Sequence, residues 1–218
     1  MTGSDKGFND RHNDHTGKRV SLAVSPDGRC IATATDKCDV ALWDAETGTH
    51  IATLEYAGDI YSLAFLPDGH LASGNGDGEI SVWDTVIGSR VRTFNAHSDK
   101  IYCLSASQSK LASSDKIVRV WDTATWECTF EFECDGHVTY EALYPNGNVA
   151  ACNRYRLYVW DTATQKLIVS KNISRLVCAA VSNDGKWLAV VSDITISLYD
   201  ADTHNRIWSH DRDSAFIS

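Results

Sequence analysis

Residues 60–84 read IYSLAFLPDGHLASGNGDGEISVWD, and this stretch contains three short apolar segments separated by two turn signals. The first signal is Pro67-Asp68-Gly69, in which proline presets φ and glycine accepts a positive φ. The second is the glycine-rich run from Gly74 to Gly78, which is unsuited to an extended strand. The stretch therefore predicts a meander of three short antiparallel strands that ends at Trp83-Asp84. One such meander cannot bury its own faces, so it needs further copies beside it.

The same pattern recurs along the chain. An aromatic residue followed by Asp closes five copies, at successive intervals of 40, 38, 39 and 39 residues. The five pairs are Trp43-Asp44, Trp83-Asp84, Trp121-Asp122, Trp160-Asp161 and Tyr199-Asp200. Intervals of about 40 to 45 residues are typical of propeller blades of the WD type. At these residues, and from about Arg19 to the C-terminus, the chain resembles the WD-repeat family.

The resemblance implies an all-β, WD-type β-propeller of four-stranded antiparallel blades, each packed against its neighbours. Residues 1–14 are expected to form a flexible tail, and residues 15–218 the propeller domain. The segment that begins at His210 is expected to start a partial sixth repeat. Propellers close with about four to eight blades, and nothing before His15 offers a closing strand. We therefore expect an incomplete propeller of five blades plus a partial sixth; a closed five-bladed ring is the alternative.

The resemblance also implies a buried hydrogen-bond network that links a His, a Ser or Thr, an Asp and the Trp of one blade. Blade three carries the whole set, namely His97, Ser113, Asp115 and Trp121. Such a network holds an imidazole between a carboxylate and a hydroxyl. The same residue types form the catalytic triad of hydrolases, but no nucleophile turn or oxyanion-hole glycine motif accompanies them. We expect a structural role.

The other blades keep parts of this network. The parts are Ser73, Asp77 and Trp83 in blade two, with Tyr56 at the His position, and His15, Thr33 and Trp43 in blade one, with Lys37 at the Asp position. In blade four, Arg154 or Tyr155 occupies the turn, and in blade five Asn172 stands at the His position. Blades four and five are therefore expected to depend more on packing.

The resemblance places protein-binding residues on the loops that lead into the inner strands. The positions just before these strands, at the mouth of the central channel, are Lys18, Asp59, Lys100, His137 and Arg175. Four of the five are or can become cationic, which suits an acidic or phosphorylated segment of a protein partner. Two other interpretations stay open: these are solvated loop charges, and His137 is the network His in a shifted register.

Trp126 is a second candidate for partner binding, on the opposite face. It stands where blades one and two have Gly48 and Gly88 in the turn before the outer strand. An indole at this position is either exposed to a partner or covers neighbouring strand residues.

Composition limits location and partners. The chain has 218 residues, and no apolar run approaches the roughly 18 residues needed to span a bilayer. The opening residues lack the apolar segment of a secretory signal, and the seven cysteines include no Cys-x-x-Cys pair, which suits reduced thiols. We expect an intracellular protein, cytoplasmic or nuclear. The net charge of −9 argues against nucleic-acid binding, and no membrane contact is expected.

The sequence favours a non-catalytic scaffold or adaptor for protein–protein interaction, with a WD-repeat part of a larger protein as one form of it. We identify no metal-ligand spacing, phosphate-binding glycine loop or paired catalytic carboxylates, and so expect no catalytic residues, cofactor or metal. One alternative is a propeller enzyme with a site at the channel mouth. Another is a truncated gene product without independent function. An incomplete propeller would also expose edges through which the chain self-associates.

Overall fold

The computed structural model describes residues 21–34, 39–56, 58–182 and 184–211, and these residues form twenty β-strands. The strands make five four-stranded antiparallel sheets, each built from strands that are consecutive in the sequence. We call each sheet a blade and number the blades in chain order. The described residues contain no helix, and hence none that could span a membrane. The predicted all-β fold of four-stranded antiparallel blades is confirmed.

The strands of each blade have the following bounds. Blade one contains β1 (Leu22–Val24), β2 (Cys30–Ala34), β3 (Val40–Asp44) and β4 (His50–Leu54). Blade two contains β5 (Ile60–Phe65), β6 (Leu71–Asn75), β7 (Glu79–Asp84) and β8 (Ser89–Asn95). Blade three contains β9 (Cys103–Ser107), β10 (Lys110–Ser114), β11 (Ile117–Asp122) and β12 (Cys128–Glu133). Blade four contains β13 (Tyr140–Leu143), β14 (Val149–Cys152), β15 (Arg156–Asp161) and β16 (Lys166–Asn172). Blade five contains β17 (Leu176–Val181), β18 (Trp187–Ser192), β19 (Thr195–Asp200) and β20 (Arg206–Asp211).

The aromatic residue of each aromatic-Asp pair occupies the same place in its blade. It lies on the third strand, opposite an aliphatic residue of the second strand, as Trp83 lies opposite Leu71 and Tyr199 opposite Leu188. In all five blades, a register shift between the third and fourth strands falls immediately before this aromatic residue. A bulge of this kind bends a strand and increases its twist. The repeat spacing therefore corresponds to one recurring structural position.

Four apolar cores fill the junctions between successive blades. At the first junction, Trp83 of blade two is buried against Leu42 and Leu54 of blade one. Trp121, Trp160 and Tyr199 pack in the same way against blades two, three and four. Burial of this apolar area, at about 25 cal/mol per Å², is the main force that holds one blade to the next.

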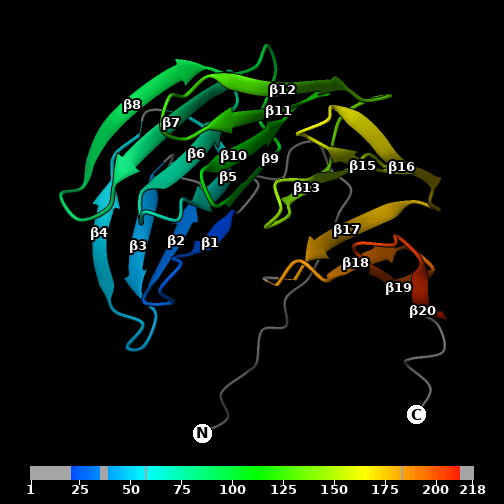
Figure 1. Cartoon of the computed structure of the whole chain (residues 1–218). Coiled ribbons are helices and arrows are strands. Elements are labelled where there is room, and N and C mark those ends of the chain that lie inside the picture. Colours follow the sequence, from blue (N-terminus) through cyan, green and yellow to red (C-terminus); the bar gives the residue numbers. More distant parts are fainter. Residues whose placement is uncertain (1–20, 35–38, 57, 183, 212–218) are drawn as a thin grey trace, which may run out of the picture.

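The blades follow one another around an open arc, from β1–β4 in blue to β17–β20 in orange and red (Figure 1). The inner strands contact each other in the order β1, β5, β9, β13 and β17. Within the described part of the chain, β17 and β1 make no comparable contact. The arrangement is that of an incomplete propeller, and the closed five-bladed ring is not formed.

The predicted sixth repeat lies at the C-terminal end of the described residues. Strand β20 extends through Asp211, so His210 and Asp211 complete the outer strand of blade five instead of starting a sixth repeat. The rest of that segment, residues 212–218, lies outside the described residues, as do residues 1–14 and His15, Lys18 and Lys37.

Candidate protein-interaction surface

Blade three brings His97, Ser113, Asp115 and Trp121 together between its strands. The Ser113 hydroxyl donates to Nε2 of His97 at 2.7 Å, and the Trp121 indole Nε1 donates to the Ser113 oxygen at 2.8 Å. Nδ1 of His97 lies 3.1 Å from Oδ1 of Asp115, without the alignment of a full hydrogen bond. We assign the imidazole proton to Nδ1, where it faces the carboxylate.

Burial decides what this network can do. The His97 side chain and Ser113 are both 0% exposed. Burial lowers the pKa of His97, against the opposing effect of the Asp115 carboxylate, so the imidazole is neutral. A substrate cannot reach the Ser113 oxygen, which is already engaged by His97 and Trp121. This geometry is that of a structural clamp between the second and third strands of the blade.

The other blades keep the indole half of this clamp to different degrees. Nε1 of Trp43 donates to Thr33 at 2.8 Å, and Nε1 of Trp83 donates to Ser73 at 3.0 Å. In blade four, Ala151 occupies the place of these hydroxyl residues. The buried Nε1 of Trp160 consequently has no hydrogen-bond partner.

The turn between the second and third strands has a side-chain anchor, which the sequence interpretation placed correctly at Asp115 in blade three and wrongly at Asp77 in blade two. In four blades, a side-chain oxygen at the end of the second strand accepts a hydrogen bond from a backbone N–H two to four residues later; the anchors are Asn75, Asp115, Asn153 and Ser192. Blade two therefore uses Asn75 and not Asp77, which is exposed. Blade four uses Asn153, while Arg154 and Tyr155 are exposed. Each anchor lies four residues after the aliphatic residue that faces the aromatic residue, and this spacing could have identified it.

Three blades contribute to a row of rings at the start of the inner strands, with Tyr61 in β5 and Tyr102 and His137 in the loops before β9 and β13. The rings of Tyr61 and Tyr102 meet edge to face with centroids 6.2 Å apart, and Tyr102 meets His137 in the same way at 5.5 Å. Nζ of Lys100 lies 5.0 Å from the centroid of Tyr61, and the Tyr61 side chain raises the pKa of Lys100. The Tyr61 ring thus supports a cationic ammonium group. The two tyrosines escaped the sequence interpretation, although each directly follows the isoleucine at the start of the inner-strand pattern.

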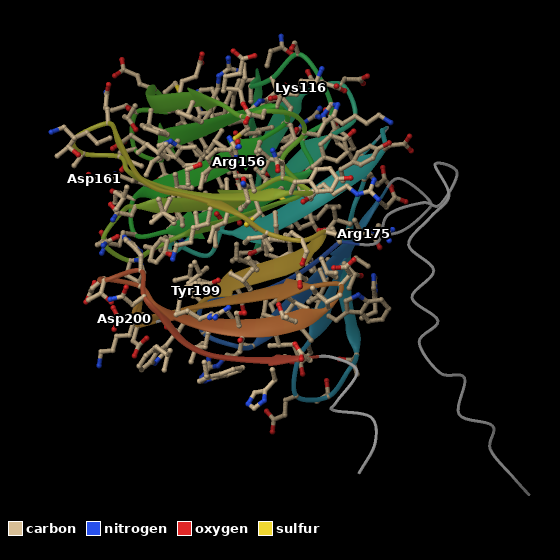
Figure 2. The ribbon with its side chains drawn as sticks, turned by 90° about the vertical axis from the view of Figure 1, so that its right-hand side faces the viewer. Lys116, Arg156, Asp161, Arg175, Tyr199 and Asp200 are labelled. Atoms are coloured by element: carbon tan, nitrogen blue, oxygen red, sulfur yellow. The ribbon has the colours of Figure 1, made fainter. Side chains whose placement is uncertain are left out.

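The remaining candidates at this face are less closely joined to the row. Arg175 and Asp59 are both exposed, and the Arg175 carbonyl accepts a hydrogen bond from the backbone N–H of Asp193. Figure 2 shows Arg175 on the same side of the molecule as Lys116, with Asp161 and Asp200 on the opposite side. Lys100, His137 and Arg175 lie in the loops before the inner strands β9, β13 and β17, at one rim, and the Asp of each aromatic-Asp pair ends the third strand of its blade, at the other rim.

Known proteins share these repeats. A family model described as WD domain, G-beta repeat matches residues 9–44, 48–84 and 88–122. The chain is 33% identical over 113 residues to COMPASS component SWD3 of Saccharomyces cerevisiae, covering 49% of this chain and 36% of that protein. The chain belongs to the WD-repeat family. A second family model, described as Outer membrane protein assembly factor BamB, matches residues 114–217.

Two further likenesses cover more of this WD-repeat chain. A Danio rerio protein described as p21-activated protein kinase-interacting protein 1-like is 33% identical over 162 residues, covering 70% of this chain and 43% of that protein. One chain of the Crystal Structure of Mitotic Checkpoint Complex has a TM-score of 0.79 at 20% identity, over 97% of this chain and 73% of that chain. At 20% identity, the similarity to this solved structure concerns the fold alone. The chain spans less than half the length of either curated relative.

The Asp of each WD pair has a local structural role. In every blade its Oδ1 accepts hydrogen bonds from the backbone N–H groups two and three residues later, as Asp84 does from Val86 and Ile87. These bonds favour the carboxylate and lower the pKa of the Asp in all five blades. The pair therefore joins a buried ring to the turn that follows it.

Trp126 lies in this turn, at the opposite rim. Its φ is +62°, close to the +69° of both Gly48 and Gly88 at the equivalent position. The indole contacts Phe94 of blade two, with centroids 5.6 Å apart, and the Arg92 guanidinium lies 5.7 Å from its ring. Trp126 therefore covers strand residues of the preceding blade with at least part of its surface.

Glu141 is an unusual buried residue that the sequence interpretation missed. It faces Ala151 on the neighbouring strand, in the place where Leu63 faces Ser73 in blade two. Glu141 is 5% exposed, and neither of its carboxyl oxygens has a hydrogen-bond partner. Burial raises the pKa of Glu141 well above its usual value, while Ser114 and the Ser105 backbone oppose the shift. The break in the repeat pattern, a carboxylic acid at an aliphatic position, was the available signal.

Proposed function

We propose that this chain is a non-catalytic protein-interaction platform, a scaffold or adaptor, and that it binds an acidic or phosphorylated segment of a protein partner. The binding site would be the channel-mouth surface, which we define as Tyr61, Lys100, Tyr102, His137 and Arg175. The row of ring contacts from Tyr61 to His137 is the observation that carries this proposal. Aromatic and arginine side chains are enriched at the energetic centres of protein interfaces.

The charge of the channel-mouth surface favours an anionic segment. Lys100 is cationic at neutral pH and lies beside the Tyr61 ring, and Arg175 can form two parallel hydrogen bonds with a carboxylate or phosphate. The whole chain carries a net charge of −9, so long-range attraction would favour basic partners. Selection of an acidic segment would therefore depend on these local cations. Asp59, at the same rim, would disfavour acidic residues placed beside it.

The relatives support the general role and leave the partner open. One is, by its name, a component of a complex, and another is a kinase-interacting protein. We propose that this chain likewise works by contact with other proteins, inside the cell, in the cytoplasm or the nucleus. Imaging of a tagged chain in cells tests this location.

The binding proposal can be tested with three fluorescein-labelled peptides of equal length, rich in phosphoserine, glutamate or lysine, by fluorescence anisotropy. We expect the phosphoserine and glutamate peptides to bind and the lysine peptide not to bind. The double variant K100E/R175E should lose at least tenfold in affinity, because each charged contact contributes about 1.5–3 kcal/mol. K186E is the matched control, since Lys186 lies in the turn between β17 and β18 at the other rim. Equal losses in both variants, or no loss in the double variant, would contradict the proposal.

A further inference from the structure

Blades four and five bring two arginines close together at the rim of the channel mouth. Arg154 lies in the turn between β14 and β15, and Arg175 lies in the loop before β17. Backbone hydrogen bonds join these two segments. The Leu176 N–H donates to the Arg154 carbonyl at 2.8 Å, and the Ile173 N–H donates to the Tyr155 carbonyl at 2.8 Å. Arg154 and Arg175 therefore belong to adjacent segments of chain, at an internal junction of the arc.

Both guanidinium groups are accessible to a ligand. Arg154 and Arg175 are exposed, and within the described part of the chain neither of them forms an ion pair. Arg156, by contrast, is paired with Asp135 at 2.8 Å. The Arg154 guanidinium lies 5.5 Å from the centroid of the Tyr155 ring, which is itself exposed. A ring of this kind supports a cation without neutralising its charge.

Arg175 has a backbone conformation that the corresponding residues of the other described blades lack. Its φ is +27°, a positive value that residues with a side chain disfavour. Asp59, Lys100 and His137 stand at the same place in blades two to four, and none of them has a positive φ. The Asp193 N–H donates to the Arg175 carbonyl at 3.0 Å and helps to hold this conformation. Strained residues of this kind are concentrated at sites of ligand contact.

We infer that Arg154 and Arg175 together bind the phosphate of a phosphorylated side chain in a protein partner, so that the chain prefers a phosphorylated segment to one that is only acidic. The inference rests on the proposed function, because it names the anionic group that the channel-mouth surface recognises. A phosphate monoester carries a charge of about −1.5 to −2 and three acceptor oxygens, which suffice for two guanidinium groups. A carboxylate has one charge and two oxygens, and one guanidinium satisfies it.

Neighbouring charges act on this pair in opposite directions. Lys116 occupies the same place in blade three as Arg154 does in blade four, directly after the turn anchor, and it is exposed. Figure 2 shows Lys116 on the same side of the molecule as Arg175, so it extends the cationic surface toward blade three. Asp193 is exposed beside Arg175, and its charge weakens the attraction for a phosphate.

Fluorescence anisotropy on the full chain tests this inference with two labelled peptides that differ only in having phosphoserine or glutamate. The phosphoserine peptide should bind more tightly. R154A should weaken its binding about tenfold or more, and that of the glutamate peptide about twofold or less, because the lost hydrogen bonds are charge-assisted. R154K keeps the charge without the planar fork and should lose most of the preference for phosphoserine. R29A is the matched control, since Arg29 is exposed in the turn between β1 and β2, at the other rim.

A variant of opposite effect separates a specific contact from general weakening. D193N removes the negative charge beside Arg175 and should strengthen the binding of the phosphoserine peptide. Inorganic phosphate and a single-stranded oligonucleotide should compete with the labelled peptide more weakly than the unlabelled phosphoserine peptide does. Both lack the peptide segment that the row of rings from Tyr61 to His137 would contact.

The outcomes distinguish this inference from the proposed function. Equal binding of the two peptides, an equal effect of R154A on both, or no gain in D193N overturns the phosphate site and leaves the binding of acidic segments in place. Stronger competition by inorganic phosphate or by the oligonucleotide overturns the assignment to a protein segment. If neither peptide binds, the proposed function itself fails.

Discussion

Ala151 stands where a hydroxyl residue would accept the indole proton of Trp160, so blade four buries an indole N–H without a partner. Ser113 fills this place for Trp121, Ser73 for Trp83 and Thr33 for Trp43. The ring of Trp160 is instead held by packing, with its centroid 4.2 Å from that of Phe132 and 5.2 Å from that of Tyr158. Blade four thus keeps the aromatic residue of the repeat and lacks its hydrogen bond.

A151S should stabilise the chain. The new hydroxyl would accept from Nε1 of Trp160 in the geometry that Ser113 has with Trp121, which is worth about 1 kcal/mol in the free energy of unfolding. Urea unfolding followed by tryptophan fluorescence measures the change. A150S is the control, because Ala150 belongs to the core on the other face of β14. If A151S were no more stable than A150S, the missing bond would not be a deficit of this blade.

H97A should destabilise blade three. The substitution leaves Asp115 and Ser113 buried without their partner, at a cost of about 1–3 kcal/mol. H137A, at the exposed His of the channel mouth, should unfold like the parent. Because burial lowers the pKa of His97 in the folded chain, its contribution is complete above the usual value of 6.5 and is lost as the pH falls below it. The difference between the parent and H97A should therefore shrink on acidification, and an equal difference at pH 7.5 and pH 5 would contradict this account.

E141Q should show the opposite dependence on pH. The raised pKa means that folded Glu141 keeps its proton where the unfolded chain, with a usual value of 4.5, releases it. Its contribution to stability is therefore complete below pH 4.5 and falls as the pH rises, by at most about 1.4 kcal/mol per pH unit. We expect E141Q to match the parent near pH 4 and to exceed its free energy of unfolding at pH 7. E127Q, at an exposed site, should follow the parent at both values, and a pH-independent difference for E141Q would contradict the buried neutral acid.

W126A and W126G should separate backbone strain from packing. Both lose the contacts of the indole with Phe94 and Arg92, so both should be less stable than the parent. Only glycine adopts the positive φ of this position without strain, which is worth about 1 kcal/mol. W126G should therefore be the more stable of the two in thermal unfolding. If alanine were equal or better, the left-handed conformation would not persist in solution.

The sequence predicts the blades because each repeated residue has the same structural role in every blade. The aromatic residue follows the bulge and fills a junction, and the Asp closes the next turn, so their spacing determines the phase of every strand. Asn75 was harder to assign, because Asp77, two residues later, also has a side-chain oxygen that could accept hydrogen bonds in the same turn. The contact of Tyr102 with both Tyr61 and His137 depends on how three blades are set against one another. Repeat spacing does not contain that information.

Because each blade consists of four consecutive strands, no strand is exchanged between blades, and the loss of one blade leaves the strand-to-strand hydrogen bonds within the others intact. Blades one and five have one neighbour each, and blades two to four have two. Unfolding should therefore begin at the ends of the arc and proceed inward, in steps of one blade, as in a linear array with nearest-neighbour coupling. Amide protons in β9–β12 would then exchange most slowly with solvent, and those in β1–β4 and β17–β20 would exchange first.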